Sequence, residues 1–472
     1  AVIALTDVKK AINVLHEEFF ETTYKQVNLF IVGVGNVGGK LLTQLKQQQA
    51  YLQQHLRLQV RVIGMANSKK MLFDDEGIDL NNWKELLQKG EENNLEEFIK
   101  VVQSKNLRNA VFADVTANDE VAKIYDQLLQ KSVSVVACNK VACSSTYEYY
   151  KKLKDTAREH NCLFLFETNV GAGLPVIGTL NDLLRSGDTV NRIEAVLSGT
   201  LNFVFNHYDG TRSFSDVVKQ AQDEGYTEPD PRLDLSGTDV MRKIMILARE
   251  SGEKLEMDQI TNHSFLPASC MKGSVDDFYA AMLQEEAHFK KLYTEAAAEG
   301  KKLKFVAMFD KGKASVGLQH IDPQHNLYHL YGKDNVVLFY TNRYPEQPLV
   351  IKGAGAGAER RRRQGHAGRG HPRVREGNGR RQGRLAVRRL QRCGALLRRA
   401  VRRQRSGQQT ECESRRARRR RLSAPDRADG RGLGPAGGDF LRRHRLYRGQ
   451  DPGIGLQLRT GDPCPPAAGA HA

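Results

Sequence analysis

The chain has 472 residues, of which 40% are apolar and 27% charged, and its net charge is +17. This apolar fraction is enough for a sizeable core, which excludes a wholly disordered protein. No apolar run approaches the roughly 20 residues needed to cross a bilayer, and the first ten residues lack a signal-peptide pattern. Seven scattered Cys do not indicate a disulfide framework. We therefore expect a soluble cytoplasmic protein with no membrane partner.

The positive charge is concentrated at one end of the chain. Residues 360–472 hold 31 Arg, no Lys and 8 acidic residues, a net charge of +23, whereas residues 1–359 have a net charge of −6. The Arg-rich tail has no sustained hydrophobic period and cannot bury enough apolar surface to offset chain entropy. We expect it to be disordered.

Three interpretations of this tail stay open. It is a basic arm that binds nucleic acid non-specifically, a low-complexity linker, or a segment that is out of frame. Arg without Lys, together with Gly, Ala and Pro, is typical of GC-rich DNA translated out of frame, so we hypothesise a frameshift or chimeric junction near Glu359. If the tail instead makes this a nucleic-acid-binding protein, binding falls steeply with salt and survives deletion of residues 1–359.

Strands and helices alternate from residue 25 to about 169, after a linker segment, residues 1–24, with an amphipathic helix at 11–20. The expected strands are 27–34, 58–66, 110–116, 132–139 and 162–167, and the expected helices are 36–49, 81–88, 95–104, 119–129 and 145–160. This alternation predicts an α/β fold, a Rossmann-type, doubly wound and mostly parallel sheet that binds a dinucleotide.

The pattern changes at about Val170. The expected elements are strands at 190–198, 303–310, 314–321, 336–341 and 349–352, with helices at 215–224 and 238–250. They predict a second α+β domain over 170–352 with a mixed or antiparallel sheet. Residues 353–359 are expected to return to the nucleotide domain.

A nucleotide fingerprint closes the first strand. The segment is Gly33-Val34-Gly35-Asn36-Val37-Gly38, and a helix follows it. Gly33 permits the tight turn, Gly35 lets a pyrophosphate approach the backbone, and Gly38 lets the helix pack against the strand. The helix N-terminus offers free N–H groups to phosphates. The alternative is a Gly-rich turn without a ligand.

The end of the second strand bears on which dinucleotide binds. An acidic residue there would bind a ribose 2′-hydroxyl and favour NAD. The sequence instead has Ala66-Asn67-Ser68-Lys69-Lys70, whose small polar and cationic side chains suit a 2′-phosphate. We expect NADP(H) to be preferred, with NAD(H) also open, and a merely solvated loop is the alternative.

A second group of polar residues spans 225–243. The acids of a Pro-rich loop precede a helix on which Asp239 and Lys243 share a face, and Ser236 or Thr238 is expected to cap that helix. A Lys beside several acids could protonate an alkoxide while the acids bind an ammonium group. An ordinary surface ion pair is the commoner meaning of this spacing and stays open.

Polar residues also end three of the predicted parallel strands, where ligands bind in such sheets. Thr116 ends the third, and Asn139-Lys140 ends the fourth, which would put Lys140 near a nicotinamide. A Gly-rich turn, residues 171–175, follows Glu167, and inward carbonyls there could hold a monovalent cation. A strand-terminal surface Lys is the alternative for Lys140.

Several motifs together resemble the homoserine dehydrogenase family. They are GVGNVGG, ACNK, FETNVGAGLPVI, LSGTLNFVF, GYTEPDPRLDLSGTDVMRK and GAGAGAE. The resemblance covers residues 5–359 and is closest to the dehydrogenase half of the bifunctional aspartokinase/homoserine dehydrogenases. It implies reversible, NAD(P)H-dependent reduction of L-aspartate 4-semialdehyde to L-homoserine in threonine and methionine biosynthesis, by a homodimer or higher homo-oligomer.

The resemblance also implies roles for single residues. Lys243 is the proton donor, Lys140 lies near nicotinamide and substrate, and Asp239 joins them as the third residue of the catalytic group. Glu228, Asp234, Asp239 and Lys140 bind substrate. Residues 33–38 contact the nucleotide, as do Ala66, Asn67, Ser68, Lys69, Thr116, Lys140, Gly225 and Gly357. A sodium ion is implied at Glu167, Val170, Ala172 and Leu174.

This chain departs from the family's pattern in two places. Leu233 stands where the family often has Asp, and Arg360 to Arg363 stand where the family continues from Gly357 into a helix that packs on the nucleotide domain. Without that helix we expect weaker cofactor binding than in a chain with the family's ending. A chain that only dimerises, without catalysis, is a further alternative.

Overall fold

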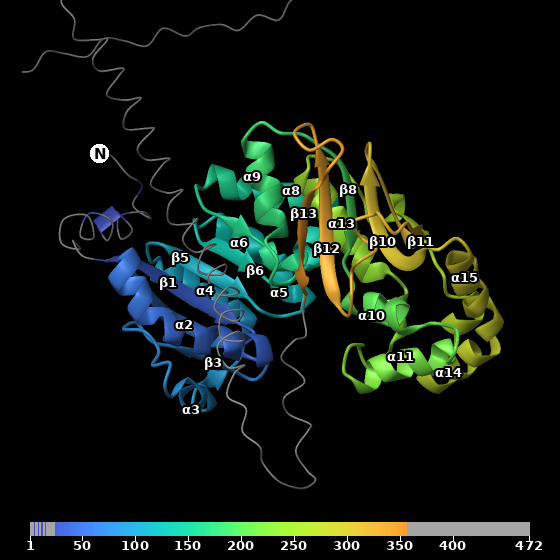
Figure 1. Cartoon of the computed structure of the whole chain (residues 1–472). Helices are drawn as coiled ribbons and strands as arrows, with labels where there is room; N and C mark the ends of the chain where they lie inside the picture. The colour runs from blue at the N-terminus through green and yellow to red at the C-terminus, as the bar shows by residue number, and fades with distance from the viewer. Residues whose placement is uncertain (1–3, 5–7, 9–10, 13–14, 16–23, 356–472) are drawn as a thin grey trace, which may run out of the picture. The chain divides into compact units, whose positions relative to one another are not determined.

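A computed structural model describes residues 4, 8, 11–12, 15 and 24–355 of the chain. The expectations for the linker helix at 11–20 and the return loop at 353–359 lie partly outside these residues. Those for Gly357 and the tail at 360–472 lie wholly outside them. The described part contains two sheets with their helices (Figure 1).

The first sheet has seven strands in the order β4-β3-β2-β1-β5-β6-β7. The strands are β1 Lys25–Val32, β2 Leu58–Ala66, β3 Lys70–Phe73, β4 Glu91–Glu92, β5 Ala110–Asp114, β6 Ser134–Ala137 and β7 Phe164–Leu165. β1, β2, β5, β6 and β7 are parallel, whereas β3 and β4 form an antiparallel edge. The predicted doubly wound sheet is confirmed, and the short antiparallel edge was not expected.

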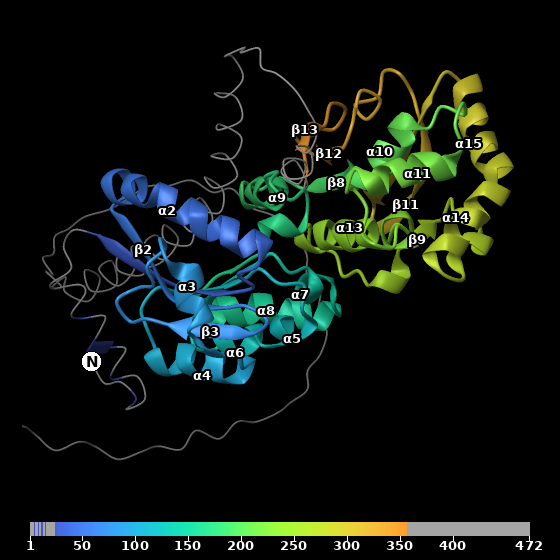
Figure 2. The same cartoon turned by 90° about the horizontal axis from the view of Figure 1, so that it is seen from below.

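Helices cover both faces of this sheet, because successive residues of β1 point to opposite sides. Val27, Leu29 and Ile31 pack with α2 (Asn36–Leu56) and α3 (Trp83–Gln88). Phe30 and Val32 pack in the core that includes α4 (Leu95–Lys105), α5 (Asp119–Lys123), α6 (Tyr125–Leu129) and α8 (Tyr147–Glu159). Figure 2 shows α2 and α4 on opposite sides of the sheet.

The predicted boundaries differ from the structure in several places. The helix expected at 119–129 is divided at Ile124 into α5 and α6, and a four-residue helix α7 (Val141–Ser144) follows β6. The strand expected at 162–167 is only two residues long, because the chain enters a 3₁₀ turn at Glu167–Asn169. Glu167 leaves the strand to accept backbone hydrogen bonds from the next helix.

The second sheet has six strands in the order β13-β12-β8-β10-β11-β9. They are β8 Val190–Val196, β9 Thr261–His263, β10 Lys302–Asp310, β11 Lys313–Ile321, β12 Asp334–Thr341 and β13 Leu349–Ala354. All neighbours are antiparallel except β9 and β11. The predicted α+β region with a mixed sheet is confirmed.

The helices of this region are more numerous than expected. They are α9 Val176–Arg185, α10 Gly199–His207, α11 Phe214–Asp223, α12 Arg232–Leu235, α13 Thr238–Glu250, α14 Val275–Gln284 and α15 Glu286–Ala298. α10 escaped prediction because six of its nine residues are buried, which hides the 3.6-residue period. Among the described residues, no helix combines the length and apolar character needed to cross a membrane.

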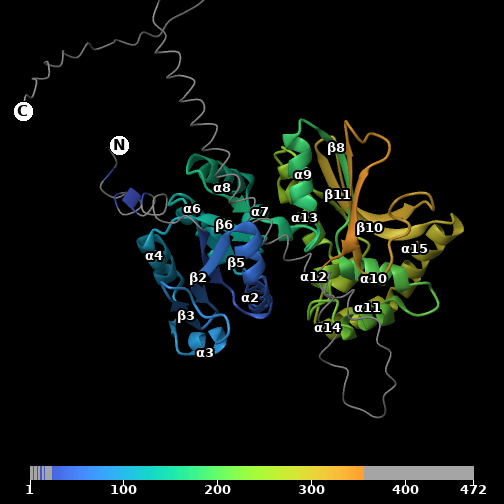
Figure 3. The same ribbon diagram turned by 60° about the vertical axis from the view of Figure 1, so that its left-hand side comes forward.

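Helix α13 contacts β10 and β11 of the second sheet and also α7 and α9. It therefore lies between α7 and the second sheet (Figure 3). The N-cap residue of α13 is neither Ser236 nor Thr238 but Gly237 in the left-handed region, with φ of 76°, although Ser236 Oγ accepts from the Thr238 backbone N–H at 3.3 Å. A Cβ there would lie 2.7 Å from the Phe305 ring, so close packing excludes a larger residue.

Strand β10 carries a buried cation, Lys304, that is not one of the predicted site residues. Lys304 is 1% exposed, and its ammonium group donates to Asn202 Oδ1 at 3.0 Å, Asn206 Oδ1 at 2.6 Å and the Leu330 carbonyl at 2.7 Å. Burial, with two Lys nearby, lowers the pKa of Lys304 to about 8. A desolvated ammonium group without a carboxylate partner is costly in the folded protein.

We expect Lys304 to make stability rise with pH between about 8 and 10.5, because the unfolded chain there binds one more proton than the folded chain. Lys304→Met removes this contribution, worth roughly 3 kcal/mol over that interval. Urea unfolding at pH 7.5 and 10 measures the difference. The exposed Lys313→Met serves as the control, and an unchanged slope for Lys304→Met would contradict the expectation.

Candidate active site

The turn after β1 has the geometry that the nucleotide fingerprint requires. Gly33 has φ of 96°, and a Cβ there would lie 2.8 Å from Thr116 Cγ2 and 2.7 Å from the backbone of Val115. Only glycine allows this turn to approach the loop after β5. Gly38 is equally constrained, since a Cβ there would collide with the Gly33 carbonyl oxygen. The predicted roles of Gly33 and Gly38 thus have a steric basis.

The middle glycine is different, because it faces open space. A Cβ at Gly35 would have nothing within 4 Å, although Gly35 is the N-cap of α2. Within the described residues no side chain caps this helix, no acidic residue lies in its first turn, and Val37 is 62% exposed. Free backbone N–H groups at an open helix N-terminus fit the pyrophosphate of a dinucleotide. The residues present therefore fit the predicted cofactor.

The turn after β2 carries no carboxylate. The buried Ala66 carbonyl accepts hydrogen bonds from Gly33 N at 2.8 Å and Val34 N at 3.1 Å. Asn67 Oδ1 accepts from the backbone N–H of Lys69 and Lys70, which closes the turn and leaves Ser68 and Lys69 exposed. An anionic group placed beside this turn would meet the Ser68 hydroxyl and the Lys69 ammonium group, although the exposed Glu92 of β4 is paired with Lys70 on the neighbouring strand.

Asp114 at the end of β5 was not predicted as a site residue. It is fully buried, and its oxygens accept from Thr116 N at 2.7 Å, Tyr125 OH at 2.5 Å and Asn139 Nδ2 at 3.1 Å. It thus connects the loops after β5 and β6, which carry Thr116 and Lys140. The signal in the sequence was a charged residue inside a predicted buried strand.

The catalytic group expected from the resemblance comes together in the structure. Asp239 at the start of α13 accepts from Lys140 Nζ at 2.5 Å and from Lys243 Nζ at 2.6 Å, through different oxygens. Lys243 also donates to the carbonyl of Leu197, just after β8, at 2.8 Å. The Asp239–Lys243 pair is therefore more than a helix-surface ion pair, because a second Lys from another element completes it. The contribution of Leu197 was missed, since a backbone acceptor leaves no side-chain signal.

The charged groups in this cluster shift one another's pKa. Burial alone would raise the pKa of Asp239, but Lys243 and Lys140 hold it well below its usual range. Burial lowers the pKa of Lys243, an effect that Asp239 opposes and Lys140 reinforces. The side chain of Lys243 is only 14% exposed. A partly desolvated ammonium group with a lowered pKa gives up its proton more readily than an exposed Lys.

The acidic loop before α13 is ordered by its own hydrogen bonds. Asp234 accepts from the Glu228 backbone N–H at 2.8 Å and from Thr200 Oγ1 at 3.2 Å, while Thr200 also donates to the Tyr226 carbonyl. Burial raises the pKa of Asp234, with the charges of Glu228 and Asp239 adding to the effect. The Glu228 side chain is exposed, and Gly225 has φ of 70° with nothing within 4 Å of a Cβ.

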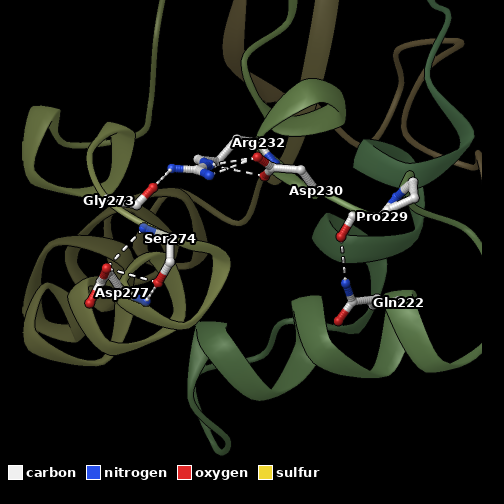
Figure 4. Close-up of polar contacts among 7 residues, drawn as sticks. All are labelled: Gln222, Pro229, Asp230, Arg232, Gly273, Ser274 and Asp277. Carbon is white, nitrogen blue, oxygen red and sulfur yellow. Dashed lines mark hydrogen bonds and ion pairs between the residues drawn. The ribbon is translucent and has the colours of Figure 1, made fainter.

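The outer part of this loop is tied to two neighbouring helices (Figure 4). Arg232 pairs with Asp230 at 2.7 Å and donates to the Gly273 carbonyl at 2.8 Å, just before α14. Gln222 on α11 donates to the Pro229 carbonyl at 3.0 Å. The segment carrying Glu228 is therefore held from both sides, although its prolines predict an extended, irregular path.

The predicted sodium ligands lie in one turn after β7. Both carboxylate oxygens of Glu167 accept backbone N–H groups, from Ile177 at 2.9 Å and Gly178 at 2.8 Å, in the first turn of α9. Gly171 and Ala172 are both left-handed, so the chain between Val170 and Leu174 turns sharply. The described residues contain no cluster of three or more His, Cys, Asp or Glu that could hold a metal ion. A site made of carbonyl oxygens stays a prediction.

Together these features define a dinucleotide-dependent oxidoreductase. An open, glycine-lined helix N-terminus lies at the carboxyl ends of the parallel strands, and Lys140 follows the end of a parallel strand there. The arrangement can bind a dinucleotide and hold a proton on Lys243 beside a reacting oxygen.

Comparisons with known proteins agree with this class. Residues 33–167 match the family model described as "Homoserine dehydrogenase, NAD binding domain", and residues 175–361 match "Homoserine dehydrogenase". The Schizosaccharomyces pombe homoserine dehydrogenase is 36% identical over 343 residues, covering 70% of this chain and 91% of that protein. The chain belongs to the homoserine dehydrogenase family, whose members are NAD(P)-dependent oxidoreductases.

Two further relatives extend the comparison. The chloroplastic bifunctional aspartokinase/homoserine dehydrogenase 2 of Arabidopsis thaliana is 42% identical over 364 residues, covering 76% of this chain. The chain spans only 40% of that protein's length. A hyperthermophilic archaeal homoserine dehydrogenase, solved in complex with NADPH, superposes with a TM-score of 0.55 at 25% identity, covering 71% of this chain and 93% of that one. The dehydrogenase hypothesis is supported, and the nucleic-acid and purely dimerising alternatives are not.

The three glycines of the fingerprint should respond differently to substitution. We expect Gly38→Ala to destabilise the fold by about 2 kcal/mol, because its Cβ would overlap the Gly33 backbone. Gly35→Ala should cost less stability than Gly38→Ala, about 1 kcal/mol for the poorer N-cap, but weaken dinucleotide binding roughly tenfold, since its Cβ would occupy the open approach.

Thermal unfolding and a fluorescence titration with NADPH measure the two effects. Gly39→Ala, where a Cβ makes only ordinary contact with Trp83 at 3.5 Å, is the matched control; it should leave binding unchanged and not lower stability, because Ala is a better helix former than Gly. Unaltered binding by Gly35→Ala would show that the dinucleotide does not approach the chain at this turn.

Proposed function

We propose that the chain catalyses the reversible reduction of L-aspartate 4-semialdehyde to L-homoserine with NAD(P)H, a reaction of threonine and methionine biosynthesis. The observation that carries the proposal is the meeting of Lys140, which follows β6 of the sheet that carries the fingerprint, with Asp239 and Lys243 of α13. The chemistry needs a hydride donor and a proton donor on the two ends of one carbonyl group. In this proposal the fingerprint at residues 33–38 binds the dinucleotide that donates the hydride, and the cluster of Lys140, Asp239 and Lys243 supplies the proton.

Lys243 is the proton donor in this proposal. The bound reduced nicotinamide supplies the hydride for the aldehyde carbon. Lys243 Nζ holds the proton that the carbonyl oxygen receives, and in the reverse direction takes it back from the hydroxyl group. Asp239 keeps the ammonium group oriented, and the Leu197 carbonyl holds it from another side. The lowered pKa of Lys243 favours the transfer.

The acids of the loop bind the amino end of the substrate. Glu228, Asp234 and Asp239 present carboxylates within one loop and the helix after it, and Glu228 is exposed and accessible to an incoming ammonium group. Asp234 supports Glu228 by accepting a hydrogen bond from the Glu228 backbone N–H. Lys140, whose ammonium group donates to Asp239, binds the nicotinamide and the substrate from the side of the nucleotide-binding sheet in this proposal.

The cofactor is NADP(H) in preference to NAD(H). Support comes from the turn at 67–70, which has no carboxylate and exposes Ser68 and Lys69. The remaining nucleotide contacts are Gly33 to Gly38, Ala66, Thr116 and Gly225. The ratio of kcat/KM for NADPH and NADH measures the preference, and a ratio below one would overturn it.

The remaining features follow from the resemblance. The proposed division is a nucleotide domain at 25–169 and a catalytic and dimerisation domain at 170–352, assembled as a homodimer or higher oligomer. A sodium ion would be held by carbonyl oxygens at Glu167, Val170, Ala172 and Leu174. The proposed compartment is the cytoplasm, although plant relatives carry chloroplastic names. Light scattering tests the proposed assembly. Activity measured with and without sodium tests the proposed ion.

Lys243→Met tests the proposed reaction directly. We expect kcat to fall at least about a hundredfold, because the proton donor is lost, while NADPH affinity stays within about twofold. Asp239 keeps Lys140 as its partner, so no uncompensated charge is buried. Steady-state oxidation of homoserine and a binding titration provide the two measurements.

Arg242→Met is the matched control, because Arg242 is the exposed neighbour on the same helix. It should retain both turnover and affinity. Full activity of Lys243→Met would refute the assigned role. Absence of activity in the unsubstituted chain, despite dinucleotide binding, would refute the proposed function.

A further inference from the structure

Helix α7 is a four-residue helix that begins directly after Lys140, its N-cap. A helix this short is not stable by itself, so contacts with other elements must hold it. The hydroxyl groups of Ser144 and Ser145 do not anchor α7 to other elements. They donate to carbonyls of the same segment, those of Lys140 and Ala142. The carbonyls of Cys143 and Ser145 at its C-terminal end are bound from elsewhere.

The group that binds them is the guanidinium of Arg249 on α13. It donates to the Cys143 carbonyl at 2.9 Å and to the Ser145 carbonyl at 2.8 Å, both through Nη1. Nε donates to the Leu255 carbonyl at 2.9 Å, and Nη2 pairs with Glu256 at 2.8 Å. The Arg249 side chain has no exposed surface. It lies on the same helix as Lys243, about 9 Å farther along the axis.

Helices α7 and α13 are therefore joined at two points. At one end Lys140 meets Asp239, and at the other the C-terminus of α7 meets Arg249. We propose that Arg249 is a positioning residue that holds α7, and with it Lys140, against Asp239 and Lys243. The kinetic part of this inference rests on the proposed function, whereas the structural part does not.

The shape of the guanidinium group explains why Arg is needed here. Its donors form a planar fork that reaches four acceptors in different directions, which the ammonium group of Lys cannot do. Its positive charge also complements the negative end of α7. The partner Glu256 accepts from the backbone N–H of Tyr147 at 2.7 Å, which extends the connection to the start of α8.

The neighbouring residue, Glu250, provides a matched control. It is buried, accepts from Lys154 Nζ and Asn181 Nδ2, both at 2.8 Å, and also from the Tyr150 hydroxyl. These contacts tie α13 to α8 and α9 rather than to α7. Glu250→Gln thus disturbs the same helix at the same depth without removing any of the hydrogen bonds that hold the segment carrying Lys140.

Hydrogen exchange of the full chain without cofactor is the first measurement. We expect Arg249→Lys to speed the exchange of backbone amides in residues 141–145 roughly tenfold or more, because two carbonyls lose a well-directed partner. Glu250→Gln should leave these amides unchanged and alter those of α8. Unchanged exchange at 141–145 in Arg249→Lys would overturn the proposal.

The second measurement is kinetic and asks whether Arg249 acts through Lys140. Arg249→Lys should lower kcat/KM for homoserine roughly tenfold in the otherwise unsubstituted chain, and less than about twofold in the Lys140→Met background. Glu250→Gln should have the same effect, whatever its size, in both backgrounds. Thermal midpoints of all variants show whether they are folded.

The outcomes separate the two proposals. Faster exchange in α7 together with a kinetic effect that disappears in Lys140→Met supports the inference. Equal kinetic losses in both backgrounds, in step with lowered thermal midpoints, would mean that Arg249 only stabilises the fold. If the unsubstituted chain binds NADPH but does not oxidise homoserine, the proposed function fails, and the exchange measurement alone decides whether Arg249 holds α7.

Discussion

The carboxylate of Asp239 between the ammonium groups of Lys140 and Lys243 is the constraint on which the site depends. The ammonium groups of Lys140 and Lys243 repel each other, and the repulsion is strong because one of them is nearly buried. An anion between them offsets this repulsion. A single acidic residue with both oxygens engaged provides that anion. The cluster keeps one positive charge in excess, which suits a site where negative charge develops on a substrate oxygen.

This constraint also ties together elements that are far apart in the sequence. Lys140 follows the parallel strand β6, whereas Asp239 and Lys243 belong to α13, which packs on the antiparallel sheet. The ion pairs form only if β6, α7 and α13 are held in one arrangement. The buried Asp114 holds the start of α7 through Asn139, which in turn accepts from the Val141 backbone N–H. Polar groups outside the predicted site thereby set the geometry of the residues within it.

The sequence predicted the parts of this structure that depend on local pattern. The parallel strands and α13 follow from hydrophobic periodicity, and Gly33, Gly35 and Gly38 follow from the steric needs of one turn. The helix α10 and the edge strands β3 and β4 were missed, because they are buried all round or only a few residues long. The partners Leu197 and Arg249 could not be predicted, since backbone carbonyls and tertiary hydrogen bonds leave no spacing in the sequence.

The departure at Leu233 can be understood from the same geometry. Leu233 is 62% exposed, on the outer side of the short helix α12, whereas Asp234 next to it turns inward to the Glu228 backbone and Thr200. Successive residues of a helix point about 100° apart, so an acid at position 233 would not face the cluster as Asp234 does. Leu instead of Asp at position 233 therefore removes only a surface charge. The carboxylates of Glu228, Asp234 and Asp239 stay in place. Among the described residues, the local charge of the site is thus set by these three carboxylates and the two Lys.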